Sequence, residues 1–191
     1  MALTPRQARD KYIVDSIGQY FVRRIQSAYN TEAALTSGKP EDYSKPLRIV
    51  MGKPDDPNIV TNPPVIAIDV LESTERDREY GVGTSTGWRH MNFVFYCYPS
   101  LNSYGSPSLN AAMLLRTYVR DSLGGKYIQI IDYSNPSFNP NSPTFCTQTM
   151  EIVNVTDPMN RGQNTTLALE RHRFDVHLEV RYPVDEVLTS T

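Results

Sequence analysis

Hydrophobic residues recur at every fourth position near the start of the sequence, and this spacing gives an α-helix one apolar face. The residues that share it are Ile13, Ile17, Phe21 and Ile25. Thr4 is a favourable N-cap, Pro5 suits the first helical position, and Gln7 completes a capping box. We therefore expect a helix from about Pro5 to Tyr29, which the helix-favouring residues 31–35 extend or follow as a short second piece.

The last long pattern alternates strictly between apolar and polar residues, as a β-strand with one buried face does. Its apolar positions are Phe174, Val176, Leu178, Val180 and Tyr182. Its polar positions, which we call the charged row, are Arg173, Asp175, His177, Glu179 and Arg181. We expect a strand from Glu170 to Tyr182 whose charged row faces solvent or another copy of the chain. The residues from Val184 onward are expected to fray.

Five further segments have the composition of strands, and one has that of a helix. The strands are expected over 47–51, 65–71, 88–98, 126–131 and 145–153. Ser106 and Pro107 are expected to open the second helix, which ends near Ser122 before two glycines. The order of helix, three strands, helix and three strands predicts an α+β fold. We expect a mostly antiparallel sheet with the N-terminal helix and one central helix packed on one face.

We expect a single domain over residues 1–191, with long loops at 52–64, 72–87, 132–144 and 154–166. The loop 72–87 joins two strands that most simply pair as an antiparallel hairpin. It carries charges of both signs, at Glu72, Glu75, Arg76, Asp77, Arg78 and Glu79. Two interpretations stay open for these residues: a solvated hairpin tip, or a polar contact surface for a partner.

Composition and charge narrow the classes of function. With 39% hydrophobic residues the chain can build a core, and its net charge of −2 disfavours general nucleic-acid binding. No apolar stretch approaches the ~20 residues of a membrane span, and the first residues lack the apolar segment of a signal peptide. We therefore expect neither membrane association nor export. Cys97 and Cys146 are expected to be free thiols buried in strands.

Candidate catalytic chemistry is sparse in this sequence. His172 and His177 lie five apart in one strand, so they point to opposite faces and cannot bind one metal ion. The glycines of Gly81–Gly83 lack the lysine and hydroxyl residue of a phosphate-binding loop. A small hydrolase that uses His90 or the carboxylates near Glu75 remains the catalytic hypothesis. We expect instead a protein that is not an enzyme and that holds no cofactor or metal.

Over roughly Pro5 to Pro183, the layout of these elements resembles the tail terminator, or tail-completion, proteins of long-tailed bacteriophages. The likeness rests on the helix DKYIVDSIGQYFVRRI, a charged hairpin, the strand WRHMNFVFYCYP, the helix SLNAAMLLRTYVRDSL and the closing strand RHRFDVHLEVRY. The chain departs from the compact members of that family in its longer loops at 52–64, 132–144 and 154–166. These loops leave related neck and tail-adaptor proteins open as alternatives.

The resemblance implies a six-membered ring that caps the finished tail tube, ends its polymerisation and presents a surface to the head-side connector. The implied partners are further copies of the chain, the tail tube protein, the head–tail connector and, in a contractile tail, the sheath. DNA is implied only as the passing genome. The implied location is the tail neck of the virion, after assembly in the host cytoplasm. The alternative is a head–tail adaptor that docks on the portal side.

In such a ring, the charged row would serve as a subunit interface, because mixed charges fix register and partner choice. An ordinary solvated strand face is the alternative for that row. The charged residues between Glu72 and Glu79 would contact the tail tube or the connector.

Overall fold

The computed structural model describes the backbone of residues 5–52, 62–81, 84–106, 108–133, 137, 139, 141–156, 159–160 and 172–187. Side chains are described over the same ranges apart from 5–9, 72–81, 84–87, 159–160 and 184–187. The expected capping box at Thr4 and Gln7 therefore lies outside the described residues, and so does most of the expected loop at 52–64.

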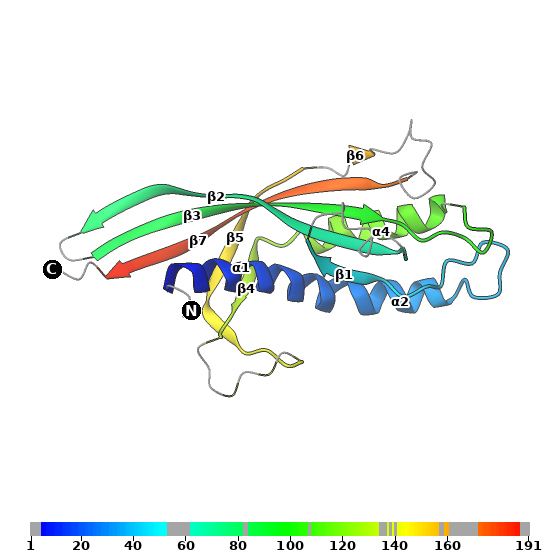
Figure 1. Ribbon diagram of the computed structural model, residues 1–191, viewed down its shortest axis with the longest axis horizontal. Coiled ribbons are helices and arrows are strands. Elements are labelled where there is room, and N and C mark those ends of the chain that lie inside the picture. The colour runs from blue at the N-terminus through cyan, green and yellow to red at the C-terminus, as the bar shows by residue number, and fades with distance from the viewer. Residues whose placement is uncertain are drawn as a thin grey trace.

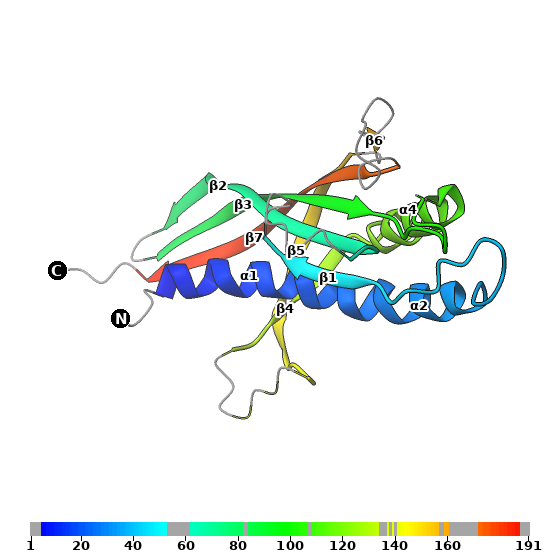
Figure 2. The ribbon, with the colours of Figure 1, turned by 45° about the vertical axis from the view of Figure 1, so that its right-hand side comes forward.

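One long N-terminal helix runs beside the sheet along the long axis of the molecule (Figures 1 and 2). It consists of α1 (Pro5–Phe21), a π-helical turn η1 (Val22–Gln26) and α2 (Ser27–Ala34). The backbone stays helical at Phe21 and Ser27, so the three pieces form one continuous element. The predicted helix and its extension are confirmed. The predicted stripe of Ile13, Ile17, Phe21 and Ile25 is buried.

The sheet places its strands in the order β1-β2-β3-β7-β5-β4, and β6 pairs with β7. The bounds are Arg48–Met51 for β1, Val65–Gly81 for β2, Thr84–Tyr98 for β3, Tyr127–Ile131 for β4, Phe145–Val155 for β5, Met159–Asn160 for β6 and Phe174–Val187 for β7. β1 runs parallel to β2, and the other pairs are antiparallel. The predicted α+β fold is confirmed.

Both helices pack on one face of the sheet and share one core. The helix α4 (Leu109–Ser122) buries Ala111, Leu115 and Val119. Two of these, Leu115 and Val119, belong to the same buried cluster as the stripe of α1 and η1 and the apolar positions of β3 and β7. The sheet curls around the N-terminal helix, because α1 contacts both β1 and β4, near the two ends of the strand order (Figure 1). Among the described residues, no helix lies on the opposite face of the sheet.

The prediction of a loop at 72–87 is wrong. β2 and β3 pair from Val65–Tyr98 to Gly81–Thr84, so only residues 82–83 separate the two strands. β7 pairs with β3 over the same length, from Phe174–Cys97 to Val187–Thr84, so the tail expected to fray is a strand as far as Val187. Main-chain pairing holds these segments, because the extensions of β2 and β7 each pair with β3, and this pairing needs no apolar pattern. We call the three-stranded extension of residues 72–81, 84–88 and 183–187 the arm.

Smaller corrections concern the ends of elements. Ser108, not Ser106, caps α4, since its Oγ accepts a hydrogen bond from the main-chain nitrogen of Ala111 at 3.1 Å. β7 begins at Phe174 and not at Glu170. At His172 the backbone adopts a left-handed conformation with φ of 68°, which a regular strand does not allow. The expected loop at 154–166 is also shorter, because β5 reaches Val155 and β6 follows at Met159.

Candidate interaction surfaces

The charged row lies in the middle of the sheet, on the face without helices. β7 has β3 on one side and β5 and β6 on the other, so the row has neighbours on both sides. Both arginines of the row form ion pairs within the chain. Arg173 Nε lies 3.0 Å from Asp175 Oδ1, and Arg181 Nε lies 2.6 Å from Glu151 Oε2 on β5. The row is less exposed than an ordinary solvated strand face, since Asp175 is buried and the other four members are half-buried. Whether the row meets another copy of the chain stays a prediction.

Aromatic rings on the same face contact the cations of the row. The Arg173 guanidinium lies 5.0 Å from the ring centre of Tyr96 and 5.2 Å from that of Tyr98. The Arg181 guanidinium lies 4.8 Å from the ring centre of Trp88. These cation–π contacts hold the arginine side chains against β3. The row and the aromatic residues of β3 thus form one packed surface rather than two.

The pKa values of one carboxyl and one thiol near the charged row are shifted. The Arg181 guanidinium, which donates a hydrogen bond to Glu151, lowers the pKa of that carboxyl below its ordinary value, and Lys126 adds to the effect. Burial raises the pKa of the Cys97 thiol well above its ordinary value, as expected for an inert buried cysteine. Cys97 and Cys146 are both free, as predicted, although Cys146 is only half-buried.

His90 sits in a buried pair with the charged row. Its Nδ1 lies 2.8 Å from Glu179 Oε1, and its Nε2 is buried without a hydrogen-bond partner among the described residues. A general base must reach the proton of its substrate, and this nitrogen is covered by protein. The geometry gives the hydrolase hypothesis no support from His90, and the Glu75 side chain lies outside the described residues. Within the described part of the chain, no three His, Cys, Asp or Glu side chains are grouped as a metal site.

The residues expected to contact a tube or connector lie on β2, in the arm. They are Glu72, Glu75, Arg76, Asp77, Arg78 and Glu79, and their side chains lie outside the described residues. The arm ends at the same side of the molecule as the start of α1 (Figures 1 and 2). These charges therefore sit on a paired strand that extends from the domain body, and not on an irregular loop.

Both outer edges of the arm lack a partner strand among the described residues. On the β2 side, pairing with β1 ends where the Gly52 nitrogen donates to the Ile68 oxygen at 2.9 Å. On the β7 side, pairing with β5 ends at Arg181. The arm is therefore a ribbon with two open edges that belong to different strands. Such edges are sites where a further strand can add.

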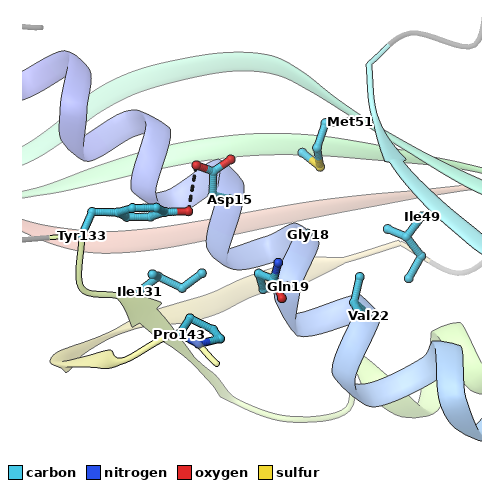
Figure 3. Close-up of a pocket in the computed structure, with 9 residues that line it drawn as sticks. All are labelled: Asp15, Gly18, Gln19, Val22, Ile49, Met51, Ile131, Tyr133 and Pro143. Atoms are coloured by element: carbon cyan, nitrogen blue, oxygen red, sulfur yellow. Dashed lines mark hydrogen bonds between the residues drawn. The ribbon is translucent and has the colours of Figure 1, made fainter. Parts of the chain in front are cut away.

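A groove of about 300 Å³ lies over the N-terminal helix, between β1 and the end of β4 (Figure 3). Gly18, Gln19 and Val22 form its floor, while Ile49 and Met51 come from β1. At the far side, the Tyr133 hydroxyl donates to Asp15 Oδ2 at 2.9 Å, and the Tyr133 ring stacks on Tyr12. The groove is the gap that the curled sheet leaves between β1 and β4.

No protein-family model and no curated protein matches the sequence. None of the helices in the described part of the chain is both long and apolar enough to cross a membrane.

Sequence reasoning missed the group of Trp88, Lys126, Tyr127 and Glu151 around Arg181. Trp88, Tyr127, Glu151 and Arg181 come from four strands, and Lys126 directly precedes β4. The residues lie up to 93 positions apart, as the numbers of Trp88 and Arg181 show. The signal available was weak: a tryptophan at the start of the strand predicted over 88–98. Only the pairing of β5 with β7, which sets Glu151 opposite Arg181, brings the charges together.

Proposed function

We propose that this chain is a structural ring subunit of a phage tail neck, which caps the tail tube, ends its polymerisation and joins the tail to the head-side connector. The proposal assigns it no enzymatic activity and no cofactor. Its support is the resemblance in element order, together with a surface whose charges are paired within the chain. A surface of that kind suits assembly better than catalysis, because its ionisable groups already have fixed partners.

The observation that carries the proposal is the arm with its two different open edges. β2 and β7 both run toward the tip of the arm, because each is antiparallel to β3. The β7 edge of one copy can therefore pair in parallel with the β2 edge of the next copy. An interface made of two unlike surfaces repeats around an axis, and a ring forms when the rotation closes. We accordingly move the proposed subunit contact from the charged row to the edges of the arm.

The pattern of pairing identifies the main-chain groups that such a contact would use. The main-chain oxygen of Ile68 points away from β3, since it accepts from the Gly52 nitrogen. The bulge between Val70 and Glu72 shifts by one residue which main-chain groups point to that side. The main-chain groups of Glu75 should then point to the open edge. On β7, the main chain of His177 points away from β3, since its nitrogen donates to Thr156 Oγ1 at 2.9 Å and its oxygen accepts from the Thr156 nitrogen at 3.0 Å. Alternation places the main chain of Asp185 at the other open edge.

Native mass spectrometry of matched variants tests the ring. We expect the unmodified chain to form a hexamer, alone or on the ends of isolated tail tubes. Glu75→Pro and Asp185→Pro each remove a main-chain donor at an open edge and should prevent assembly. Glu75→Lys and Asp185→Lys change the charge at the same two positions but keep the main-chain N–H donor. These two variants should therefore still assemble. Circular dichroism serves as the control that the proline variants remain folded.

The proposal fails if the chain stays monomeric and ignores tube ends, or if the proline variants assemble normally. Electron microscopy of phage particles that lack this protein separates the two neck functions. Overlong tails would indicate termination, whereas tails of normal length with open heads would indicate the adaptor. The charges of the arm, from Glu72 to Glu79, are the proposed contact with the tube or the connector. The lysine variant at Glu75 should therefore weaken tube binding while the ring persists.

A further inference from the structure

A cavity of about 520 Å³ opens on the helix-free face of the sheet, where the arm separates from β5 and β4. Arg181 is the last residue of β7 that pairs with β5, and beyond it the strands diverge (Figure 1). β3, β4, β5 and β7 each contribute to the lining, through Trp88, Tyr127, Glu151 and Pro183 among others. We call this cavity the Trp88 pocket.

The apolar part of the pocket consists of exposed aromatic residues. Trp88 and Tyr127 are among the large hydrophobic residues of the described chain that remain exposed, and the half-buried Pro183 of the arm also lines the pocket. Tryptophan, tyrosine and arginine are the residues that most often dominate the free energy of protein–protein binding. Rings of this kind offer a large contact area at a low cost in conformational entropy.

The charged part of the pocket presents positive charge to the solvent. Glu151 binds both cations, with its Oε2 at 2.6 Å from Arg181 and its Oε1 at 3.6 Å from Lys126. The exposed fraction of the side chain is 68% for Lys126 and 37% for Arg181, but only 16% for Glu151. Two cations and one carboxylate leave one net positive charge, and it is the positive groups that a ligand would meet first.

The positions of these cations decide between ligands of opposite charge. Arg181 lies over the Trp88 ring at 4.8 Å, and the Lys126 nitrogen lies 5.5 Å from the centre of the Tyr127 ring. The ring faces that would receive a cationic ligand are therefore already occupied by the chain's own cations. An anionic ligand meets no such competition and can accept hydrogen bonds from the exposed Lys126 ammonium.

We propose that the Trp88 pocket binds an acidic peptide segment of a partner protein, with a carboxylate between Lys126 and Arg181 and a neighbouring apolar side chain against Trp88, Tyr127 and Pro183. The volume of the Trp88 pocket accommodates two adjacent side chains. The pocket is open where the arm separates from β5, so an extended peptide can enter there. Nucleic acid fits less well, because a single net charge neutralises few phosphates. The inference does not depend on the ring, since the pocket is formed within a single copy of the chain. Of its residues, Pro183 lies on the open β7 edge, two positions before Asp185.

Trp88 makes the test direct, because it is the only tryptophan of the sequence. Its fluorescence reports on the pocket without a label. The probe is the peptide acetyl-Asp-Phe-amide, whose phenylalanine does not interfere with tryptophan emission. We expect a saturable change in Trp88 emission with this peptide. Acetyl-Asn-Phe-amide should bind about fivefold more weakly, the equivalent of one exposed ion pair, and acetyl-Lys-Phe-amide should not bind.

Variants of the lysine separate a specific site from general attraction. Lys126→Ala should weaken binding of the acidic peptide about fivefold, and Lys126→Arg should restore it. The matched control is Lys39→Ala, which removes an exposed lysine elsewhere and should change nothing. Neither change at Lys126 threatens the fold, because this side chain is the most exposed member of the pocket's charged group.

The proposal is overturned if emission does not saturate with the acidic peptide, if the Asp and Asn peptides bind equally, or if Lys126→Ala binds as the unmodified chain does. Inorganic phosphate or a short oligonucleotide that binds more tightly than the acidic peptide would assign the pocket to phosphate groups and overturn the peptide assignment. These outcomes are distinct from failure of the ring, which is read from the mass of the assembly.

Discussion

Replacing Asp10 by alanine tests how the start of the N-terminal helix is fastened to the sheet. Asp10 Oδ1 accepts a hydrogen bond from Arg89 Nη1 at 2.7 Å and another from the Tyr182 hydroxyl at 2.8 Å. Arg89 lies on β3 and Tyr182 on β7, so one carboxylate links three elements at the base of the arm. The side chain of Arg89 is 11% exposed and that of Asp10 is 32% exposed.

The expected cost of Asp10→Ala is about 3 kcal/mol in the free energy of unfolding. Each hydrogen bond to a charged group contributes about 1.5–3 kcal/mol, so two bonds give an upper bound of about 6 kcal/mol. Because Asp10 is partly exposed, water can replace part of these hydrogen bonds in the variant. The expected cost is therefore about half of the upper bound. Tyr182→Phe removes one of the two bonds together with its donor and should cost about 1.5 kcal/mol.

Urea unfolding followed by the emission of Trp88 provides the measurement, with far-ultraviolet circular dichroism as the second probe. The variant that combines Asp10→Ala with Tyr182→Phe should lose less stability than the sum of the two single losses. Both substitutions remove the same hydrogen bond between Tyr182 and Asp10. Asp10→Asn keeps an oxygen acceptor and should fall between the unmodified chain and Asp10→Ala. A loss below about 0.5 kcal/mol for Asp10→Ala, with an unchanged slope against urea, would show that water satisfies Arg89 and Tyr182 and would refute the reasoning.

Three further predictions concern buried or crowded groups. Tyr29→Phe should stabilise the fold by about 1 kcal/mol in the same urea assay, because the buried Tyr29 hydroxyl has no hydrogen-bond partner among the described residues. Gly18→Ala should raise stability by about 0.5–1 kcal/mol, since a Cβ there meets only the flexible Met51 sulfur, at 3.1 Å, and a loss would mean that Met51 cannot move. Burial is the main reason why the pKa values of Tyr29, Tyr133 and Tyr182 are raised above their ordinary value of 10.0. Folding favours the protonated form of these phenols, so stability does not depend on them below that pH and falls as the pH rises past it. Absorbance of phenolate at high pH should therefore show three tyrosines that ionise only with unfolding.

The local patterns predicted the elements that bury an apolar face. The stripe from Ile13 to Ile25 and the alternation from Phe174 to Tyr182 both lie in the core, because burial requires the same period as the backbone geometry. The arm was missed for the converse reason. Residues 72–81 have no apolar alternation, and their strand is held by main-chain pairing with β3, which is paired in turn with β7. Propensity is weak evidence for a strand whose stability comes from its neighbours.

The candidate sites, like the fold, were predictable from the sequence only in part. The charged row could be identified from sequence, but its ion pairs could not. Glu151 and Arg181 lie 30 positions apart, and His90 and Glu179 lie 89 apart. The sequence by itself determined which side chains share a face of each strand, because that depends on a period of two. Only the tertiary structure decided which strands are neighbours, and hence that β7 lies inside the sheet with its charges paired. Hydrogen bonds between strands form through space, so the order of strands, and every pair that depends on it, is a property of the whole fold.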